Sequence, residues 1–171
     1  MKQSRYITTL ILALITFSLY AQSLASESGI TNKYIFTSLT YERQVLKTKI
    51  AAGAVVTRNF AYSSTGYGFA GSIHLPFFRN DSTISPTSSV AINTQIISTK
   101  NNLPFTQFNQ LYIGLFVGYY SDIKIYKSIL LTNNLSLGGI VDRRDFTLNG
   151  KDNVISYDYS IFFSLGLKVQ I

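Results

Sequence analysis

The last segment of the chain carries the pattern that most limits its fold. Apolar and aromatic residues occupy every odd position there: Ile155, Tyr157, Tyr159, Ile161, Phe163, Leu165, Leu167, Val169 and Ile171. Among the even positions between them, only Phe162 is bulky and apolar. Successive side chains of a β-strand point to opposite faces. The alternation therefore predicts a long strand with one apolar and one polar face.

The same two-residue period recurs along the chain, and helical periodicity is nearly absent. We expect eight strands, at about 33–43, 46–58, 67–78, 88–98, 111–120, 122–131, 134–147 and 155–171. Asn149-Gly150 is a strong hairpin signal, and Ser121-Asp122 and Asn133-Asn134 indicate further turns. The sequence thus predicts an all-β protein, a single antiparallel up-and-down β-barrel of about eight strands.

The N-terminus has the features of a secretory signal peptide. Lys2 and Arg5 are basic, residues 8–20 are mostly apolar, and the small residues Ser23 and Ala25 stand three and one before a candidate cut. The apolar run is shorter than the roughly 20 residues of a membrane-spanning helix. We therefore expect residues 1–25 to be removed and residues 26–171 to form the barrel domain. An uncleaved N-terminal anchor helix is the alternative.

Composition excludes several classes of function. The chain has no cysteine and one histidine, so disulfides, cysteine-based zinc sites and histidine-rich metal sites are excluded, and we expect neither a metal nor a cofactor. Without Lys2 and Arg5, 13 basic residues stand against 8 acidic ones, scattered along the chain. We expect no nucleic-acid partner, because no such motif is present. A mild basic surplus fits anionic lipid or polysaccharide head groups.

The alternation alone does not say which face of the barrel is outside. A soluble barrel buries its apolar face, whereas an outer-membrane barrel turns it toward lipid. The C-terminal alternation is about 53 Å long at roughly 3.3 Å per residue, which is more than a soluble domain of this size needs. Many of the 24 tyrosine and phenylalanine residues also lie near expected strand ends, as in the aromatic girdles of membrane barrels. Both features favour the membrane.

The alternation also continues to the last residue, through Ile171, Val169, Leu167, Leu165 and Phe163. This resembles the C-terminal insertion signal of bacterial outer-membrane barrels, which usually ends in an aromatic residue where this chain has Ile171. As a pattern, the chain after residue 25 resembles the small eight-stranded outer-membrane proteins of the OmpA, OmpX and opacity type. The resemblance implies a monomeric barrel, inserted by the barrel-insertion machinery, with both termini in the periplasm.

Two features fit this arrangement poorly. Lys127 stands near the middle of the expected strand 122–131, and a lipid-facing lysine at the bilayer midplane costs about 2–4 kcal/mol. Either that strand has a bulge, or Lys127 faces the lumen. The outer loops would be 43–46, 79–88, 120–122 and 148–153, two of them very short, whereas the periplasmic link 99–108 is long.

The inward faces of the expected strands collect charged residues. The predicted lumen charge network consists of Glu42, Lys47, Lys49, His74, Lys124, Asp142, Arg144, Asp158 and Lys168. Charges buried in a barrel must pair, and eight strands, unlike the larger porin-like barrels, leave little room for a channel. We therefore expect the network to fill and stiffen the lumen, with no open pore.

An alternative function is that of an outer-membrane enzyme that modifies lipid A. Barrels of this size that do so use histidine, serine and a carboxylate, and His74 is the one histidine of the chain. Ser72 lies on the same strand face and Glu42 also faces inward, so these three are candidate catalytic residues. The deacylases carry His-x-Ser, whereas this chain has Ser72-Ile73-His74. A lone histidine in a strand is more often a hydrogen-bonded polar residue.

The main expectation is a bacterial outer-membrane barrel with a structural, surface-interaction or adhesion role. Loops 79–88 and 148–153 would meet a host or envelope partner, and Arg143 would contact lipopolysaccharide phosphates at the outer end of its strand. A soluble periplasmic barrel that binds a small apolar ligand is the third interpretation. The fold alone names no partner.

Overall fold

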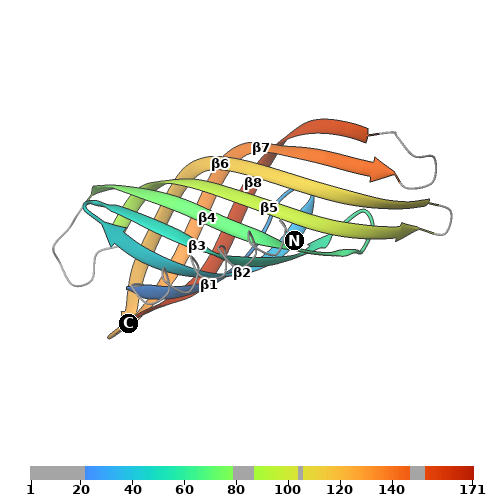
Figure 1. Ribbon diagram of the computed structural model, residues 1–171. Helices are drawn as coiled ribbons and strands as arrows, with labels where there is room; N and C mark the ends of the chain where they lie inside the picture. The colour runs from blue at the N-terminus through green and yellow to red at the C-terminus, as the bar shows by residue number, and fades with distance from the viewer. Residues whose placement is uncertain (1–21, 79–86, 104–105, 147–152) are drawn as a thin grey trace, which may run out of the picture.

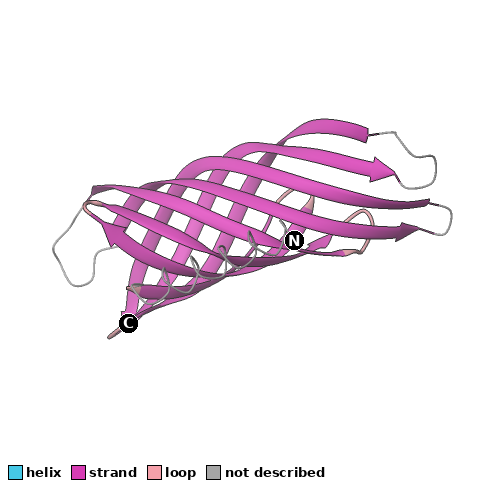
Figure 2. Ribbon diagram, in the orientation of Figure 1, coloured by secondary structure: helices cyan, strands magenta, loops and turns pink. Residues whose placement is uncertain are grey.

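The computed structural model describes residues 22–78, 87–103, 106–146 and 153–171, which form eight strands (Figure 1). The strands are β1 (Ser23–Ile30), β2 (Tyr34–Val45), β3 (Thr48–Asn59), β4 (Thr65–Phe78), β5 (Thr87–Leu103), β6 (Thr106–Tyr126), β7 (Ile129–Phe146) and β8 (Asn153–Gln170). Each pairs with the next, and β1 pairs with β8, so the antiparallel sheet closes into a barrel. The predicted all-β up-and-down barrel is confirmed (Figure 2). Among the described residues, no helix is long and apolar enough to cross a membrane.

The two ends of the barrel are distinguished by the chain termini. Ser23 pairs with Gln170 across the seam between β1 and β8, so the start of β1 and the C-terminus lie together (Figure 1). We call this the terminal end; the turns after β2 and β6 also lie there. The turns at 31–33 and 60–64 lie at the opposite end, which we call the far end.

The strands on the two sides of the barrel differ in length. β1 to β4 have 8 to 14 residues, whereas β5 to β8 have 17 to 21. The ladder between β5 and β6 continues to Leu103 and Thr106, while β4 pairs with β5 only as far as Thr99. The longer strands therefore project beyond the shorter ones at the far end, as Figure 1 shows.

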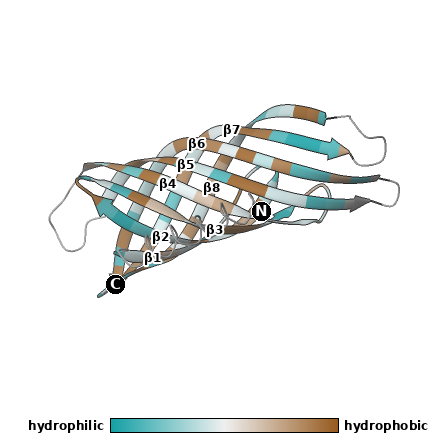
Figure 3. Ribbon diagram, viewed as in Figure 1, coloured by the Kyte–Doolittle hydropathy of each residue, from teal (hydrophilic) through white to brown (hydrophobic). Residues whose placement is uncertain are grey.

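The apolar face of the sheet is on the outside of the barrel. In β8, Tyr159, Ile161 and Leu165 are exposed, whereas Ser164 and Lys168 are buried. The outward positions predicted for the other strands follow the same parity. The ribbon in Figure 3 shows hydrophobic and hydrophilic residues alternating along the strands. The predicted direction of the two faces is confirmed.

Two predicted turns are wrong. Ser121-Asp122 lies inside β6 and Asn133-Asn134 inside β7. The chain turns instead at Lys127, which has a positive φ of 34°, after the ladder shifts register between Lys124 and Tyr126. The expected strand 122–131 is thus divided between two strands, and the conflict over Lys127 disappears because Lys127 is an exposed turn residue rather than a mid-strand one. The outer loop expected at 120–122 is absent for the same reason.

The first strand of the barrel comes from a segment that sequence analysis left outside the strands. β1 pairs with both β2 and β8 along its whole length, and the boundary expected after Ala25 lies inside it. One more strand at the start reverses the expected direction of every strand from 33–43 to 111–120. The segment after β4 therefore joins strands at the terminal end and the one after β7 joins them at the far end, so the two expected surface loops are not on the same side. Residues 79–86 and 147–152, and with them Asn149-Gly150, lie outside the described residues.

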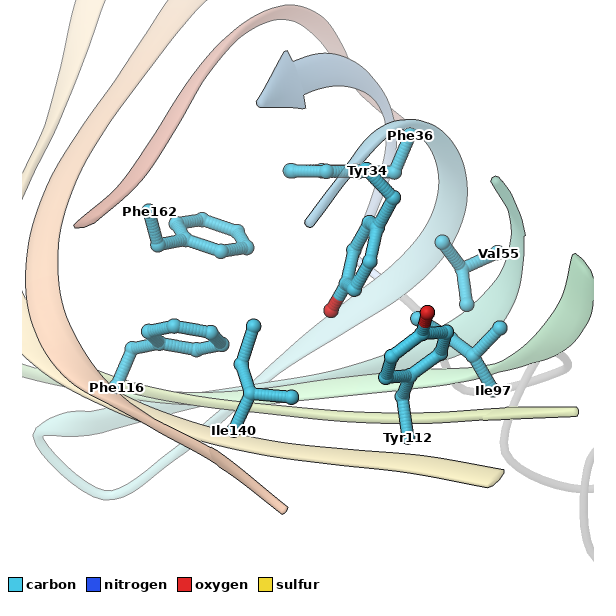
Figure 4. Close-up of a cluster of buried hydrophobic side chains, with 8 residues drawn as sticks. All are labelled: Tyr34, Phe36, Val55, Ile97, Tyr112, Phe116, Ile140 and Phe162. Carbon is cyan, nitrogen blue, oxygen red and sulfur yellow. The ribbon is translucent and has the colours of Figure 1, made fainter. Parts of the chain in front are cut away.

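Aromatic and aliphatic side chains fill the middle of the lumen. The cluster in Figure 4 consists of Tyr34, Phe36, Val55, Ile97, Tyr112, Phe116, Ile140 and Phe162. The Phe162 ring centroid lies 4.9 Å from that of Phe36 and 5.1 Å from that of Phe116. Gly114 leaves room for the Phe116 ring, since a Cβ at Gly114 would come within 2.6 Å of it. The alternation of glycine with aromatic residues thus lets a narrow barrel close around large rings.

Candidate functional site

Four charged side chains meet inside the lumen near the terminal end. Lys168 Nζ lies 2.9 Å from Glu42 Oε2 and 2.9 Å from Asp122 Oδ2. Lys49 Nζ lies 2.8 Å from the same oxygen of Asp122. We call Glu42, Lys49, Asp122 and Lys168 the ion network. Ser23 Oγ adds a hydrogen bond to Glu42 Oε1 at 3.2 Å, so β1 also contributes to it.

The strand alternation is what places the ion network inside. Its members come from β2, β3, β6 and β8, and each occupies an inward position of its strand. Lys168, for example, is 1% exposed, while Leu167 and Val169 on either side of it face outward. Because a buried charge without a partner is costly, each of these groups depends on the others. The network therefore ties together four strands that are not all neighbours in the sheet.

His74 lies beside the ion network and has few polar contacts. Its Nδ1 atom is 3.4 Å from Glu42 Oε2, within ion-pair distance but without hydrogen-bond geometry. Its ring stacks on Tyr120, with ring centroids 3.9 Å apart and an angle of 23° between the planes. The Lys168 ammonium lies 5.0 Å from the centroid of the same Tyr120 ring. Tyr120 thus packs against both the imidazole and the ammonium.

A small cavity lies next to this group. It measures about 30 Å³, which is room for about two water molecules. Glu27, Glu42, Ser72, His74 and Tyr120 are among the residues that line it. A cavity of this size and polarity suits water that would serve the Nδ1 atom of His74, which no protein group satisfies. It is too small for a lipid chain or another apolar ligand.

A second polar group occupies the lumen toward the far end. Asp142 Oδ1 accepts a hydrogen bond from Gln110 Nε2 at 2.8 Å, and Gln110 Oε1 accepts one from Asn101 Nδ2 at 2.9 Å. Arg144 Nη2 lies 2.7 Å from Asp142 Oδ2, and Asn59 Nδ2 donates to Tyr112 Oη. We call this group, made of Asn59, Asn101, Gln110, Tyr112, Asp142 and Arg144, the far-end layer.

A solved structure shares the fold of this barrel. The chain has the fold of Neisserial surface protein A. The two structures superpose with a TM-score of 0.52, and the match covers 87% of this chain and 94% of the other. Sequence identity is 15%, so the likeness concerns the fold. No protein-family model and no curated protein sequence matches the chain.

Like the neisserial barrel, this chain closes its sheet with eight strands, and the predicted resemblance to small eight-stranded barrels agrees with that match. The residues predicted for the lumen separate into distinct groups. Glu42, Lys49, His74 and Lys168 come together at the terminal end. Asp142 and Arg144 belong to the far-end layer. Asp158 pairs with Lys33 at 2.6 Å and is partly exposed at the far end.

Two predicted members lie outside any network. Lys47 is exposed and follows β2 directly in the turn to β3, beside Leu46, whose φ is 57°. Lys124 is exposed where the β6 ladder shifts register just before the turn at Lys127. Both departures have the same physical reason: the alternation of faces stops where a strand gives way to a turn. Neither lysine is therefore part of the lumen.

Sequence analysis missed three residues of the terminal end. Asp122 was assigned to a turn, although it holds both lysines of the ion network. Tyr120 ends the expected strand 111–120 and had no predicted role. Glu27 was left outside the expected strands, although it accepts a hydrogen bond from Ser164 Oγ at 3.0 Å. Counting Asp122 in register with Tyr120 would have placed it in the lumen.

The remaining candidates lie as follows. Ser72 is partly buried and lines the small cavity two residues before His74. Glu42 lies near the terminal end of β2, whereas the outer loop expected at 43–46 would have placed it at the cell-surface end. Arg143 faces outward on β7, and its Nε lies 3.0 Å from Asp145 Oδ1. Among the described residues, no group of three or more His, Asp and Glu side chains is placed to hold a metal ion.

Proposed function

We propose that this chain is a bacterial outer-membrane barrel with a closed lumen, whose role is structural or lies in surface interaction, including adhesion. The observation that carries the proposal is the inversion of the usual faces. Large apolar residues are exposed around the barrel, among them Leu39, Leu115 and Leu137, while Glu42, Asp122 and Lys168 are buried inside. In water this arrangement would expose most of the apolar surface. In lipid it is the arrangement expected of a barrel.

Strand length supports the same proposal. β2, β3 and β4 have 12 to 14 residues, more than the 9 to 11 that a tilted strand needs to cross a bilayer. The strands of β5 to β8 are longer still and extend past the apolar band at one end. With the terminal end in the periplasm, the longer strands would project from the cell surface.

The contents of the lumen oppose a pore. The ion network, the aromatic cluster and the far-end layer lie one after another along the barrel axis. Beside the far-end layer, Tyr62 of the turn between β3 and β4 contacts Phe108 edge to face, with ring centroids 5.3 Å apart. A barrel of eight strands has little space left for a channel. Its function would therefore lie on its surface.

The far end is the part that would meet a partner. Its described turns are 31–33 and 60–64, and the projecting ends of β5 to β8 stand beside them. Arg143 and Asp145 are exposed on the outer face of β7 near this end, where lipopolysaccharide phosphates would be in reach. The solved neighbour is named as a surface protein, which supports a surface role for this fold.

The other two interpretations fit the geometry less well. A lipid A-modifying enzyme needs its histidine where lipid can reach it, whereas His74 is 3% exposed inside the lumen at the terminal end. A soluble barrel for an apolar ligand needs an empty apolar interior, whereas side chains fill the apolar middle of this lumen and the small cavity beside the ion network measures about 30 Å³. If the lipid A profile is unchanged with His74→Ala, the interpretation as a lipid A-modifying enzyme is wrong. A changed profile would support that interpretation.

The proposal is tested by location and orientation together. The tagged chain should partition with outer-membrane fragments, resist extraction by carbonate, and migrate faster on gels before boiling than after it. An epitope inserted at Ser63 should bind antibody on intact cells, and the same epitope inserted at Lys47 should bind only after the outer membrane is broken. A chain that is folded and soluble in the periplasm without detergent would overturn the proposal. Surface exposure at Lys47 alone would reverse the orientation.

A further inference from the structure

The start of β1 carries an inference about where the exported chain is processed. Small residues before a cut are the mark of signal peptide cleavage. The bonds after Ala21, Ser23 and Ala25 all follow a small residue. We propose that the cut falls between Ala21 and Gln22, so that the mature protein begins at Gln22. The inference rests on the proposed function, because only an exported chain is processed in this way.

Strand length is the first argument for a start at Gln22. Gln22 extends β1, since its N–H donates to the Glu42 carbonyl at 2.8 Å and its own carbonyl accepts from the Ile171 N–H at 3.0 Å. Together with Gln22 and Thr31, β1 reaches the length that a tilted membrane strand needs, about 9–11 residues. A cut after Ala25 would leave 26–30 as the whole strand, which is too short to cross.

The charge of the new N-terminus is the second argument. Ser26 pairs with Leu39 on β2 and Leu167 on β8, both of which face outward into the apolar band. A start at Ser26 would place an ammonium group there, where a charge is costly. Gln22 is exposed at the end of the barrel next to the C-terminal residue Ile171. A start at Gln22 puts the ammonium at the exposed end of the barrel, outside the apolar band.

The ion network is the third argument. Ser23 Oγ donates to Glu42 Oε1 at 3.2 Å, and Ala25 is buried against the lumen, where it lines the small cavity beside Glu42. A cut after Ala25 would remove both residues and open the seam beside the buried pair of Glu42 and Lys168. A cut after Ser23 would still remove the hydrogen bond to Glu42.

The sequence pattern by itself favours the other bonds. Ser23 and Ala25 are both small at the two positions that matter for a cut after Ala25, whereas a cut after Ala21 places the bulkier Leu19 three residues before it. Ala21 still supplies the small residue directly before the bond. The structure of the barrel uses residues 22–25, and we give this structural argument more weight than the pattern of small residues before the cut.

The experiment determines the N-terminal residue of the protein from outer-membrane fragments. The full chain is expressed with its own N-terminus, and the intact mass and the N-terminal peptide are measured. The expected mature protein begins at Gln22. A start at Leu24 or Ser26 overturns the inference while leaving the proposed function intact. A protein from these fragments that still begins at Met1 also overturns the inference, because no bond was then cut, and leaves the proposed location intact.

A matched pair of variants tests the bond directly. Ala21→Phe puts a bulky residue directly before the proposed cut, whereas Ser18→Phe makes a similar change three residues upstream. We expect Ala21→Phe to lower the amount of mature protein at least tenfold, with accumulation of the precursor, and Ser18→Phe to be processed like the natural chain. Both positions precede β1 in the sequence. Normal processing of Ala21→Phe would overturn the inference.

Discussion

Buried polar groups are paired differently at the two ends of the lumen. At the terminal end, Glu42, Asp122 and Lys168 are almost completely buried, with Lys168 shared between the two carboxylates, while Lys49 keeps 25% of its side chain exposed. At the far end, Asn101 donates a hydrogen bond to Gln110, which in turn donates one to Asp142. Arg144, which pairs with Asp142, keeps 28% of its side chain exposed. Water can replace a lost partner at the far end but has little room at the terminal end. The terminal end should therefore be the more sensitive to substitution.

The largest effect is expected for Lys168→Met. The change leaves Glu42 buried without its lysine and leaves Asp122 with Lys49 alone. Breaking a buried ion pair from one side costs about 3–5 kcal/mol. Urea unfolding in lipid vesicles, followed by the gel migration of unboiled protein, measures the loss. Adding Glu42→Gln removes the stranded charge and should recover part of it; a double variant no more stable than Lys168→Met would contradict this account.

The second effect concerns the outer face. Leu165 and Ile155 are both exposed and outward on β8, but Leu165 lies beside β1 and Ile155 lies beyond the point where β1 ends. Leu165→Lys should lower the free energy of unfolding by about 2–4 kcal/mol, as for a lysine near the bilayer midplane, and Ile155→Lys by about 0–1 kcal/mol. The same unfolding assay compares them. Equal tolerance of both lysines would mean that the outer face does not contact lipid.

A smaller effect is expected for Asp142→Asn in the far-end layer. The amide keeps the shape of the side chain but loses the charge that pairs with Arg144 and accepts from Gln110. A hydrogen bond to a charged group is worth about 1.5–3 kcal/mol, and partial access of water to Arg144 should bring the loss toward the lower value. A loss as large as that of Lys168→Met would show that the far end is as dry as the terminal end.

The smallest effect on stability is expected for Arg143→Ala. The ion pair of Arg143 with Asp145 is exposed on both sides, and such pairs are worth about 0–1 kcal/mol. The same variant should bind lipopolysaccharide less tightly if Arg143 meets its phosphates, which a vesicle-binding assay with and without lipopolysaccharide measures. Asp145→Ala is the matched control. If the two variants bind lipopolysaccharide equally, Arg143 does not contact its phosphates.

The sequence predicted which residues face outward because the alternation of a strand is a local property. It failed at the turns for a reason specific to this kind of barrel. Asp122 and Asn134 look like turn residues, yet each is a buried lumen residue with a polar partner, Lys168 for the one and Asn93 for the other. In a barrel with a polar interior, polar side chains inside strands and polar side chains in turns are not distinguishable by type. The turn at Lys127 contains neither Gly nor Asn, so the local sequence did not predict a turn there.

The candidate site was partly predictable for the same reason. Glu42, Lys49, His74 and Lys168 were expected to face inward from parity alone, and the structure places them in the lumen. Which of them meet could not be predicted, because that depends on the register between strands far apart in the sequence. Register in turn depended on β1, whose first residues were assigned to the export signal. A single misplaced strand thus moved Glu42 and His74 to the opposite end of the barrel.

The seam between β1 and β8 joins residues from the two ends of the sequence, as the pairing of Ser23 with Gln170 shows. Closing a loop of that length is entropically slow, and the contacts that reward it form only when the final strand has arrived. Until then the chain carries two open strand edges that could pair with other chains. Assembly of this protein should accordingly require a catalyst that shelters both edges, the task for which a barrel-insertion machinery is suited.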